Sequence, residues 1–287
     1  MLLTIGLGAG FDDPVRRLTD QAAALGWFHG ARAITDKASP AWMSEYYELT
    51  AELRASNPKG YGLWSWKPFC VLRTLLSLEE GDHLYYLDAG CELSALGEGR
   101  MKFFDRDIAE HGALFFELPF GERTWTKPSL LEKYDPAVRE SPHVQATWFG
   151  LKNCAATREI VRSWWETCSD RDFWALRDEA GISHRHDQSV LSCVVKSMRQ
   201  GFMARPWEDV FAPWLYVRDS WALLEPVHAL RQRNAKSVVT RLVGSSTLSA
   251  CEENLGRPGM SFRLRSAARR VVSKVRDEMI LAKHGLR

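Results

Sequence analysis

The stretch from Gly60 to Leu93 constrains the fold most, because it places a helix start and a buried strand next to each other. Pro68 suits the first turn of a helix, where the missing N–H would have no partner in any case. Lys67 therefore stands at a helix N-terminus, where a cation opposes the helix dipole by roughly 0.3–1 kcal/mol and a bound phosphate is favoured. The sequence thus predicts an anion at Lys67. The apolar face of the helix comprises Phe69, Val71, Leu72, Leu75, Leu76 and Leu78.

A short strand follows this helix. Residues 83–87 form a nearly continuous apolar run, which is typical of a strand buried in a parallel sheet. Asp88 comes directly after it, and open α/β sheets bind their ligands at the carboxyl ends of the strands. Lys67 and Asp88 together predict a polar ligand site. We expect the substitution Lys67→Ala to weaken ligand binding more than folding.

The first part of the chain alternates strands and helices, as βαβ units do. Strands are expected at 2–5 and 31–35, with a helix at 14–25. The segment 6–11 is rich in glycine, but Phe11 stands where the dinucleotide-binding fingerprint needs its third glycine. This segment is either a plain strand-to-helix turn or a loop that touches a nucleotide base. The fold class is therefore α/β, with a mostly parallel sheet flanked by helices.

Composition and charge indicate one folded domain with a basic tail. The 287 residues, 45% of them hydrophobic, suffice for a single large domain. Residues 231–287 hold 13 Lys and Arg against 4 Asp and Glu, although the net charge of the whole chain is only +2. We assign residues 1–235 to the domain, and 236–287 to a linker and a basic amphipathic helix. Such a tail suits an anionic membrane surface rather than a nucleic acid, because few aromatic residues accompany its charges.

Cysteine usage and the start of the sequence point to the cytoplasm. The six cysteines include no Cys-x-x-Cys pair, so we expect buried thiols in a reducing compartment. The opening run MLLTIGLGAG has no basic start, and it is too short and too rich in glycine for a signal peptide or a spanning helix. We expect a cytoplasmic protein that associates with membranes only peripherally.

Two loop regions stand out from the periodic segments. Tyr61, Trp64 and Trp66 fall in a loop broken by glycine, so they either line a ligand pocket or cover the helix that follows. A polar stretch at 119–142 follows an expected strand at 113–118, and long connections of this kind are usually functional or mobile.

A second polar cluster, His-Arg-His-Asp-Gln, occupies residues 184–188 directly before a helix. Asp187 is either a capping carboxylate, worth about 0.5–2 kcal/mol, or a catalytic group. Capping does not explain the two histidines and the arginine, because cations are disfavoured at a helix start. Gly150, in an expected strand at 144–151, either serves a bulge or lets a ligand approach closely.

Several strings of the sequence are distinctive. They are GYGLWSWKPF and GDHLYYLDAGCEL within residues 60–93, WTKPSLLEKY at 125–134, QATWFGLKN at 145–153 and HRHDQSVLS at 184–192. Together they resemble a bacterial group of GT-A-fold glycosyltransferases, enzymes that move a sugar from a nucleotide diphosphate to an acceptor. The resemblance implies a GT-A-like, Rossmann-like domain. It also implies transfer of a hexose or a similar sugar from a nucleotide-diphosphate sugar to a glycan or lipid-linked acceptor of the cell surface.

The resemblance also implies roles for individual residues. In such enzymes an Asp-x-Asp motif holds a divalent metal, Mn²⁺ or Mg²⁺, on the donor diphosphate. Here the motif reads Asp88-Ala89-Gly90, so only Asp88 is left as a metal ligand. Many such enzymes place a histidine near the end of the chain on the metal or the diphosphate; His228 is either that helper or a surface residue. The implied donor-binding residues are Lys67, Trp66, Asp88, Ala89, Gly90, Gly150 and Arg231; Asp187 and Gln188 are catalytic, and His186, Trp125 and Lys127 lie on the acceptor side.

Two other classes stay open. A nucleotidyltransferase uses a related sheet, but here the loop after the first strand lacks the Thr-Arg or Ser-Arg ending expected of that class. A non-catalytic carbohydrate-binding protein would stack sugars on the tryptophans alone, and it would bind glycan without a nucleotide.

Overall fold

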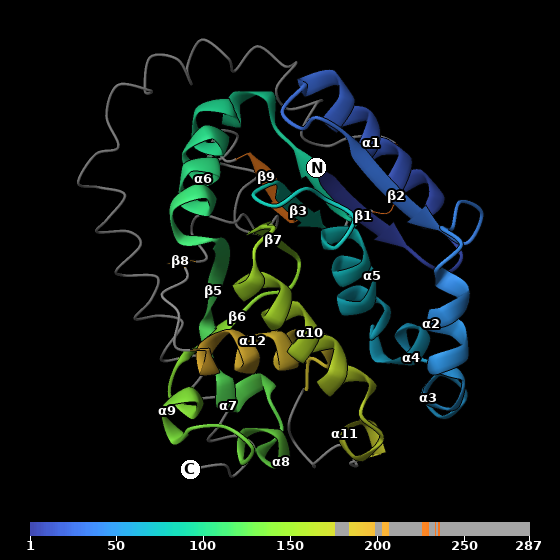
Figure 1. The fold of residues 1–287 in the computed structure, drawn as a ribbon, viewed down its shortest axis with the longest axis vertical. Helices are drawn as coiled ribbons and strands as arrows, with labels where there is room; N and C mark the ends of the chain where they lie inside the picture. Colours follow the sequence, from blue (N-terminus) through green and yellow to red (C-terminus); the bar gives the residue numbers. More distant parts are fainter. Residues whose placement is uncertain (176–183, 199–202, 207–225, 230–232, 234, 236–287) are drawn as a thin grey trace.

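The computed structural model describes residues 1–175, 184–198, 203–206, 226–229, 233 and 235. Within them, seven strands form one sheet in the order β2-β1-β3-β7-β5-β6, with β8 paired to β5 (Figure 1). Five of these strands run in one direction, and β6 and β7 run against them. The strands are β1 (Leu2–Gly6), β2 (Ala31–Thr35), β3 (His83–Leu87), β5 (Ala113–Gly121), β6 (Pro142–Val144), β7 (Trp148–Lys152) and β8 (Met203–Pro206).

A small second sheet and a set of helices complete the described fold. Strands β4 (Cys91–Leu93) and β9 (Val227–Ala229) pair in antiparallel fashion. The longer helices are α1 (Asp12–Leu25), α5 (Trp66–Leu75), α6 (Glu98–His111), α10 (Ala155–Ser169) and α12 (Asp187–Ser197). The shorter helices are α2 (Met43–Leu49), α3 (Ala51–Ser56), α4 (Gly60–Leu63), η1 (Ala95–Gly97), α7 (Glu122–Trp125), α8 (Pro128–Leu131), α9 (Pro136–Arg139) and α11 (Arg171–Ala175).

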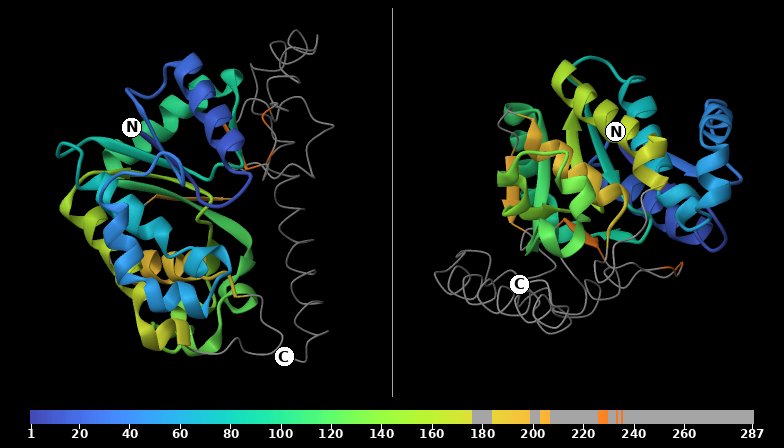
Figure 2. Two further views of the ribbon diagram at one scale, coloured as in Figure 1. Left: turned by 90° about the vertical axis from the view of Figure 1, so that its right-hand side faces the viewer. Right: turned by 90° about the horizontal axis from the view of Figure 1, so that it is seen from below.

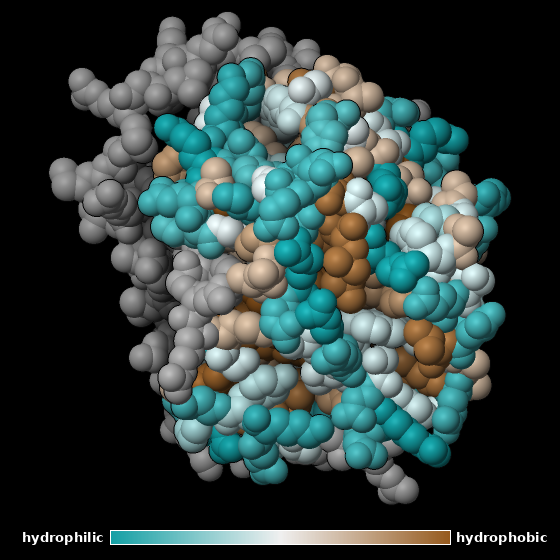
Figure 3. Space-filling view, viewed as in Figure 1, coloured by the Kyte–Doolittle hydropathy of each residue, from teal (hydrophilic) through white to brown (hydrophobic). Residues whose placement is uncertain are grey.

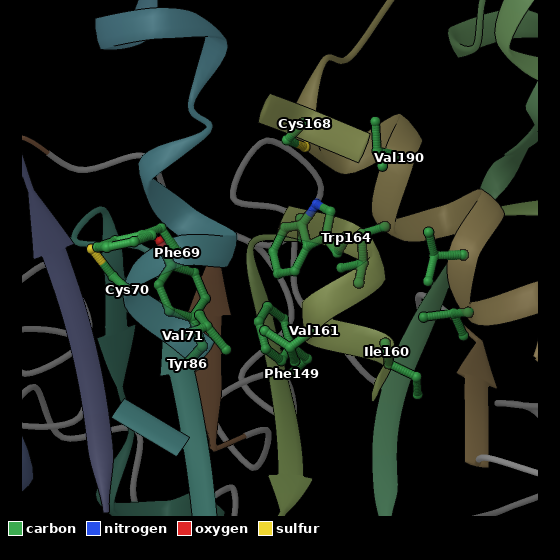
Figure 4. Packing of buried hydrophobic residues seen from close by; sticks show 14 of the residues in the cluster. Phe69, Cys70, Val71, Tyr86, Phe149, Ile160, Val161, Trp164, Cys168 and Val190 are labelled. Carbon is green, nitrogen blue, oxygen red and sulfur yellow. The ribbon is translucent and has the colours of Figure 1, made fainter. Parts of the chain in front are cut away.

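Helices cover both faces of the sheet and bury a separate apolar layer on each. In the left-hand view of Figure 2, α1 and α6 lie above the strands, and α2, α5, α10 and α12 lie below them. In the lower layer, Trp164 of α10 packs edge-on against Phe149 of β7, and Phe69 of α5 belongs to the same apolar cluster (Figure 4). The upper layer packs Leu18 of α1 and Phe104 of α6 against the other side of the sheet. The sheet is therefore buried on both faces, as its continuous apolar strands require.

The structure confirms the predicted α/β fold, with its mostly parallel sheet flanked by helices. Strands appear at 2–6, 31–35 and 83–87, and α1 buries Val15, Leu18 and Ala22 as its periodicity predicts. The segment expected to be one strand at 144–151 is broken instead. β6 ends at Val144 and β7 begins at Trp148, and the backbone between them turns toward the site described below.

The polar stretch at 119–142 is more ordered than the sequence indicates. It contains the end of β5, the three short helices α7, α8 and α9, and the start of β6. Prolines open two of these helices, because proline costs nothing at a first helical turn. Four of the five described cysteines are buried, and all five are free thiols, as expected.

Several predictions concern residues outside the described part of the chain. The basic helix within 236–287, its role at a membrane and the assignment of Arg231 all fall there. Within the described residues, no helix has both the length and the apolarity that crossing a bilayer requires. The face drawn in Figure 3 is largely hydrophilic, with small separate hydrophobic patches.

Gly150 has a packing role in the centre of β7. A Cβ atom at this position would lie 2.2 Å from Ile108 Cδ1 and 3.5 Å from a ring carbon of Tyr85. The missing side chain therefore makes room for α6, on the face of the sheet that α6 covers. This contact accounts for the glycine without the donor sugar that the resemblance implies at this position.

We predict that Gly150→Ala destabilises the fold by about 1–3 kcal/mol, because the added methyl group overpacks the α6 interface. Ile108→Val removes the clashing Cδ1 atom, so the double variant should recover part of the loss. Urea denaturation of the two single variants and the double variant measures this coupling. Gly99→Ala in α6, the helix that contains Ile108, is the control, since nothing lies within 4 Å of its Cβ position. Equal losses in Gly150→Ala with and without Ile108→Val would contradict the packing role.

Candidate active site

Lys67 forms the centre of the candidate active site. Its side chain is only 6% exposed, and its Nζ atom lies 3.1 Å from Asp88 Oδ1 and 3.1 Å from Asp187 Oδ2. The ammonium group also donates a hydrogen bond of 3.2 Å to the carbonyl oxygen of Ala146. One cation is thus held between two carboxylates and a backbone oxygen, away from bulk water.

Three elements bring these groups together. Lys67 is the second residue of α5, Asp88 follows β3 directly, and Asp187 is the first residue of α12. Tyr86 donates its hydroxyl hydrogen to Asp88 Oδ1 at 2.7 Å. Trp164 donates its indole N–H to the carbonyl oxygen of Asp187 at 2.7 Å. The site therefore lies at the carboxyl end of β3, where the sequence predicts it.

The charges of this site are unequal, because two carboxylates share one ammonium group. Burial disfavours the charge of Lys67, but Asp187 and Asp88 outweigh that effect and raise the pKa of Lys67 above its usual value. Burial raises the pKa of Asp187 to about 6; Lys67 opposes this shift, and Asp88 adds to it. The Asp88 side chain is 37% exposed, so water stabilises part of its charge. Asp187 is therefore the carboxylate that changes protonation near neutral pH.

The two carboxylates also explain why a lysine stands at the start of α5. The sequence predicts an anion there, since the helix dipole disfavours an unpaired cation. The structure supplies that anion from within the protein, as Asp88 and Asp187. A donor phosphate is thus not needed to account for Lys67, and its contact with a donor stays a prediction.

The residue before Asp187 has an unusual backbone conformation. His186 has φ 46° and ψ −116°, and the Gln188 N–H donates a hydrogen bond of 3.0 Å to the Arg185 carbonyl oxygen. These values define a type II′ turn with His186 at the position that normally holds glycine. A non-glycine residue in such a region costs on the order of 1–3 kcal/mol. The surrounding structure must therefore hold His186 in place.

The ring of His186 lies against the ring of Trp64, with 5.6 Å between centroids and 25° between planes. We call this pair the Trp64–His186 stack. Trp64 belongs to a left-handed turn in which Tyr61 and Leu63 also have φ near +56°. Left-handed backbone costs roughly 1–2 kcal/mol for each non-glycine residue. Two strained segments thus meet ring to ring beside the Lys67 site.

The three aromatic residues of this loop have separate roles. Trp66 is 7% exposed, and its indole N–H donates a hydrogen bond of 3.0 Å to the Gly60 carbonyl oxygen. Trp64 is engaged by His186. Tyr61 is 41% exposed, so it is the member of the group whose ring faces solvent most. Trp66 therefore contributes to the core, and its donor-binding role stays a prediction.

The expected acceptor-side residues contact the segment before α12. The Trp125 carbonyl oxygen accepts hydrogen bonds from the Arg185 N–H at 3.1 Å and the Ser189 hydroxyl at 2.7 Å. The Lys127 N–H donates to His184 Nδ1 at 3.4 Å. The Lys127 side chain is buried. Trp125 and Lys127 therefore hold this segment through their backbone groups, and contact with an acceptor stays a prediction for them and for His186.

A buried carboxylate that sequence reasoning missed anchors α12. Glu122, at the start of α7, accepts hydrogen bonds from the Thr126 hydroxyl at 2.6 Å and from His143 Nδ1 at 2.8 Å. Ser192 and Lys196 of α12 also donate to it. Burial opposes its charge, but the interaction with His143 and the charge of Lys196 lower the pKa of Glu122 to about 2. Glu122 is therefore ionised and fully satisfied inside the protein.

The sequence carries a signal for this anchor. Gln188, Ser192 and Lys196 recur every four residues along α12, so they form one polar stripe beside its apolar face. Gln188 uses its side-chain oxygen to accept a hydrogen bond of 3.2 Å from the Ala146 N–H. Ser192 likewise accepts a hydrogen bond from the Val144 N–H, so two members of the stripe bind α12 to the broken strand, and Lys196 pairs with Glu122 instead. Gln188 thus has a clear structural contact, and its catalytic role stays a prediction.

The turn after Asp88 is held by an arginine of α1. Arg17 of α1 donates hydrogen bonds of 3.1 Å to the carbonyl oxygens of Ala89 and Cys91. Arg17 and Glu92 are both buried, with Arg17 Nε 3.9 Å from Glu92 Oε1. Ala89 and Gly90 thus belong to a fixed turn, and their contact with a donor stays a prediction.

The described residues do not assemble a metal site around Asp88. Among them, no three His, Cys, Asp or Glu side chains cluster as metal ligands. Asp88 Oδ1 already accepts from Tyr86 and pairs with Lys67. His228 lies in β9 opposite Glu92 of β4 and is buried. This donor set does not fit a divalent cation, so Mn²⁺ or Mg²⁺ bound with the donor stays a prediction without a mechanistic role here.

A cavity of about 280 Å³ lies at the other end of the sheet. Its lining includes Trp27, Phe28, Asp82 and Asp105, at the amino ends of β1 and β3. Because the candidate active site lies at the carboxyl end of β3, this cavity is not part of it.

Comparisons with known proteins yield structural similarity only. No protein-family model matches the chain, and no curated protein matches it. Mouse xyloside xylosyltransferase 1 in its apo form aligns with a TM-score of 0.46 and 12% identity, over 80% of this chain and 96% of the mouse chain. A glycosyltransferase involved in glycosylation of the major capsid of PBCV-1 aligns with a TM-score of 0.42 and 12% identity, over 84% and 96%. The function proposed below rests on the geometry of the site.

We predict that Lys67→Met destabilises the protein by about 3–5 kcal/mol at pH 8, because it leaves Asp187 buried without its cation. The loss should shrink as the pH falls toward 6, since removal of Lys67 raises the pKa of Asp187 further and a protonated Asp187 carries no charge to compensate. Urea denaturation at several pH values measures both effects. Lys102→Met is the control, because its pair with Glu98 is exposed and worth at most about 1 kcal/mol. A loss below that of the control would contradict the buried ion pair and restore the expectation that Lys67 serves donor binding more than folding.

Proposed function

We propose that this protein is a glycosyltransferase that moves a sugar, a hexose or similar, from a nucleotide-diphosphate sugar to a glycan or lipid-linked acceptor. One observation carries the proposal. Two carboxylates, Asp88 and Asp187, flank a buried ammonium group at the carboxyl end of a parallel strand, where α/β sheets bind ligands. The sequence strings that resemble GT-A-fold glycosyltransferases contain all three of these residues and support the same function.

The transfer step breaks the bond between the sugar's anomeric carbon and the diphosphate oxygen, and it forms a bond from that carbon to an acceptor hydroxyl oxygen. The acceptor loses a proton, and the diphosphate leaves with the electron pair. Asp187 suits the proton-accepting role, because a base with a pKa of about 6 is ionised at neutral pH and still binds a proton readily. Its charge also stabilises the cationic character that the sugar gains in the transition state.

Lys67 keeps Asp187 ionised and fixes its direction through the ion pair of 3.1 Å. Asp88, which is partly exposed, is the carboxylate of the pair that a donor reaches from solvent. The guanidinium carbon of Arg233 lies 4.7 Å from the centre of the Phe11 ring, which follows β1. We assign the diphosphate to Arg233 and to Arg231, because arginine pairs with phosphate through two hydrogen bonds. In the proposed arrangement, the donor binds beside Asp88 and the acceptor hydroxyl lies beside Asp187.

A panel of nucleotide-diphosphate sugars tests the proposal. Each compound is added to the purified protein with EDTA or with Mn²⁺, and both melting temperature and nucleotide release are measured. A transferase should be stabilised by at least one intact donor and then release the nucleoside diphosphate. Lys102→Met serves as the control variant, since Lys102 lies on the surface of α6. Stabilisation by glycans without any donor binding would indicate a non-catalytic carbohydrate-binding protein, and release of pyrophosphate would indicate a nucleotidyltransferase.

We predict that Asp187→Asn lowers turnover by about 10²-fold or more, as loss of a general base does, while donor affinity barely changes. In the wild type, kcat/KM should fall about tenfold per pH unit below pH 6, because protonation of Asp187 removes the base. This acid limb should be absent from the residual activity of the variant. Asparagine keeps the size of the side chain, and Lys67 retains Asp88 as its partner. Full activity in Asp187→Asn would move the catalytic role to another group, with Glu117, His184 and His186 as the next residues to test.

A further inference from the structure

Two strained backbone segments meet at one ring contact beside the catalytic carboxylate. His186 occupies the glycine position of a type II′ turn, and Trp64 has φ +61° in a left-handed turn. Their rings stack at 5.6 Å, and the ring of His184 packs edge-on against His186 at 5.3 Å. Strain of this kind persists only where other contacts hold it in place.

The two stacked rings lie close in sequence to the two residues of the buried ion pair. Trp64 comes three residues before Lys67, and His186 comes directly before Asp187. The two rings therefore join the start of α5 to the start of α12, at the same place where Lys67 and Asp187 form their ion pair. The stack and the ion pair are two parallel links between the same two helix starts.

The turn itself does not require the imidazole ring. Its hydrogen bond runs between backbone groups of Arg185 and Gln188, and its flanks are held by Trp125 and Trp164. Glycine at position 186 would form the same turn without strain. The side chain therefore serves something other than the turn.

We propose that the Trp64–His186 stack holds Asp187 against Lys67, in the orientation in which the Asp187 carboxylate accepts the acceptor's proton. His186 and Trp64 are thus positioning residues of the transfer reaction, and this inference rests on the proposed function. The stack fixes the position of the start of α12 relative to the start of α5. It thereby fixes the orientation of the Asp187 carboxylate. A displacement of about 1 Å of a catalytic group can cost 10²-fold in rate.

The stack also shields the ion pair from water. His186 is 9% exposed and Asp187 is 6% exposed, so the stacked imidazole and the carboxylate are buried next to each other in the chain. The groups that interact with Asp187 from other elements include Lys67 of α5, Tyr86 of β3, Asp88 after β3 and Cys168 of α10. Loss of the rings would admit water to this set and loosen the carboxylate, while the backbone contacts of the turn remain.

The test combines stability and kinetics on the full-length protein. We expect His186→Gly to keep or raise the melting temperature, because glycine relieves the strained backbone. We expect kcat to fall at least tenfold, with KM for the nucleotide-sugar donor within threefold of the wild type. His186→Phe should keep kcat within about threefold, since it preserves the stack without an imidazole.

Two further variants separate strain from stacking. Leu63→Gly is the matched control, because it relieves a left-handed residue of the same turn and leaves both rings in place. It should raise the melting temperature and leave kcat unchanged. Trp64→Gly should lower kcat as much as His186→Gly does, and the double variant should lower it no further, because the two rings act as one unit.

Several results would overturn the inference. It fails if kcat of His186→Gly stays within twofold of the wild type. It also fails if the fold-reduction of kcat in the double variant equals the product of the two single reductions, or if His186→Phe lowers kcat as much as His186→Gly does. The last result would assign the imidazole a chemical role instead. An inactive wild type across the donor panel would overturn the proposed function itself, and it differs from these outcomes because they require an active wild type.

Discussion

The arrangement of this protein depends on one buried ammonium group that has two carboxylate partners. Lys67 cannot stay charged inside the protein without Asp88 and Asp187, and these residues come from a strand end and from a distant helix start. The ion pairs therefore fix β3, α5 and α12 relative to one another. Because two negative charges share one positive charge, the site keeps an excess negative charge, and the more deeply buried Asp187 takes up a proton more readily than an ordinary aspartate.

The sequence predicts the parts of the fold that depend on local pattern. Residues 83–87 read as a buried strand because they are continuously apolar, and Asp88 and Asp187 are site candidates because they follow a strand end and open a helix. What the sequence does not reveal is that Lys67 binds both of them. The partners lie 21 and 120 positions further along the chain, and no local periodicity encodes such a contact. A lysine at a helix start indicates an anion, and the structure supplies two carboxylates there, while a bound phosphate stays a prediction.

The remaining surprises have the same physical origin. Glu122 falls in a stretch that reads as a polar connection, yet it is buried because His143, Ser192 and Lys196 from other elements satisfy it. Gly150 reads as a bulge or a ligand contact, whereas its neighbour is Ile108 from α6. In both cases the residue type is explained by a neighbour that is distant in sequence and close only in the folded chain. Polar residues at four-residue spacing on an otherwise apolar helix are the one sequence signal that would have indicated the Glu122 anchor.

The break between β6 and β7 has a consequence for how this region can vary. The carbonyl oxygen of Ala146 accepts from Lys67, its N–H donates to Gln188, and the carbonyl oxygen of Thr147 accepts from the Asp88 N–H. All three contacts are made by main-chain atoms, which every residue except proline carries in full. Substitution at Thr147 can therefore change the side chain without changing the hydrogen bond that its carbonyl oxygen accepts from Asp88. At Ala146 the chemistry is equally independent of residue type, and only proline and the lack of space around a buried alanine limit the choice. A comparison of side chains alone would overlook these positions, although the charged centre is built on them.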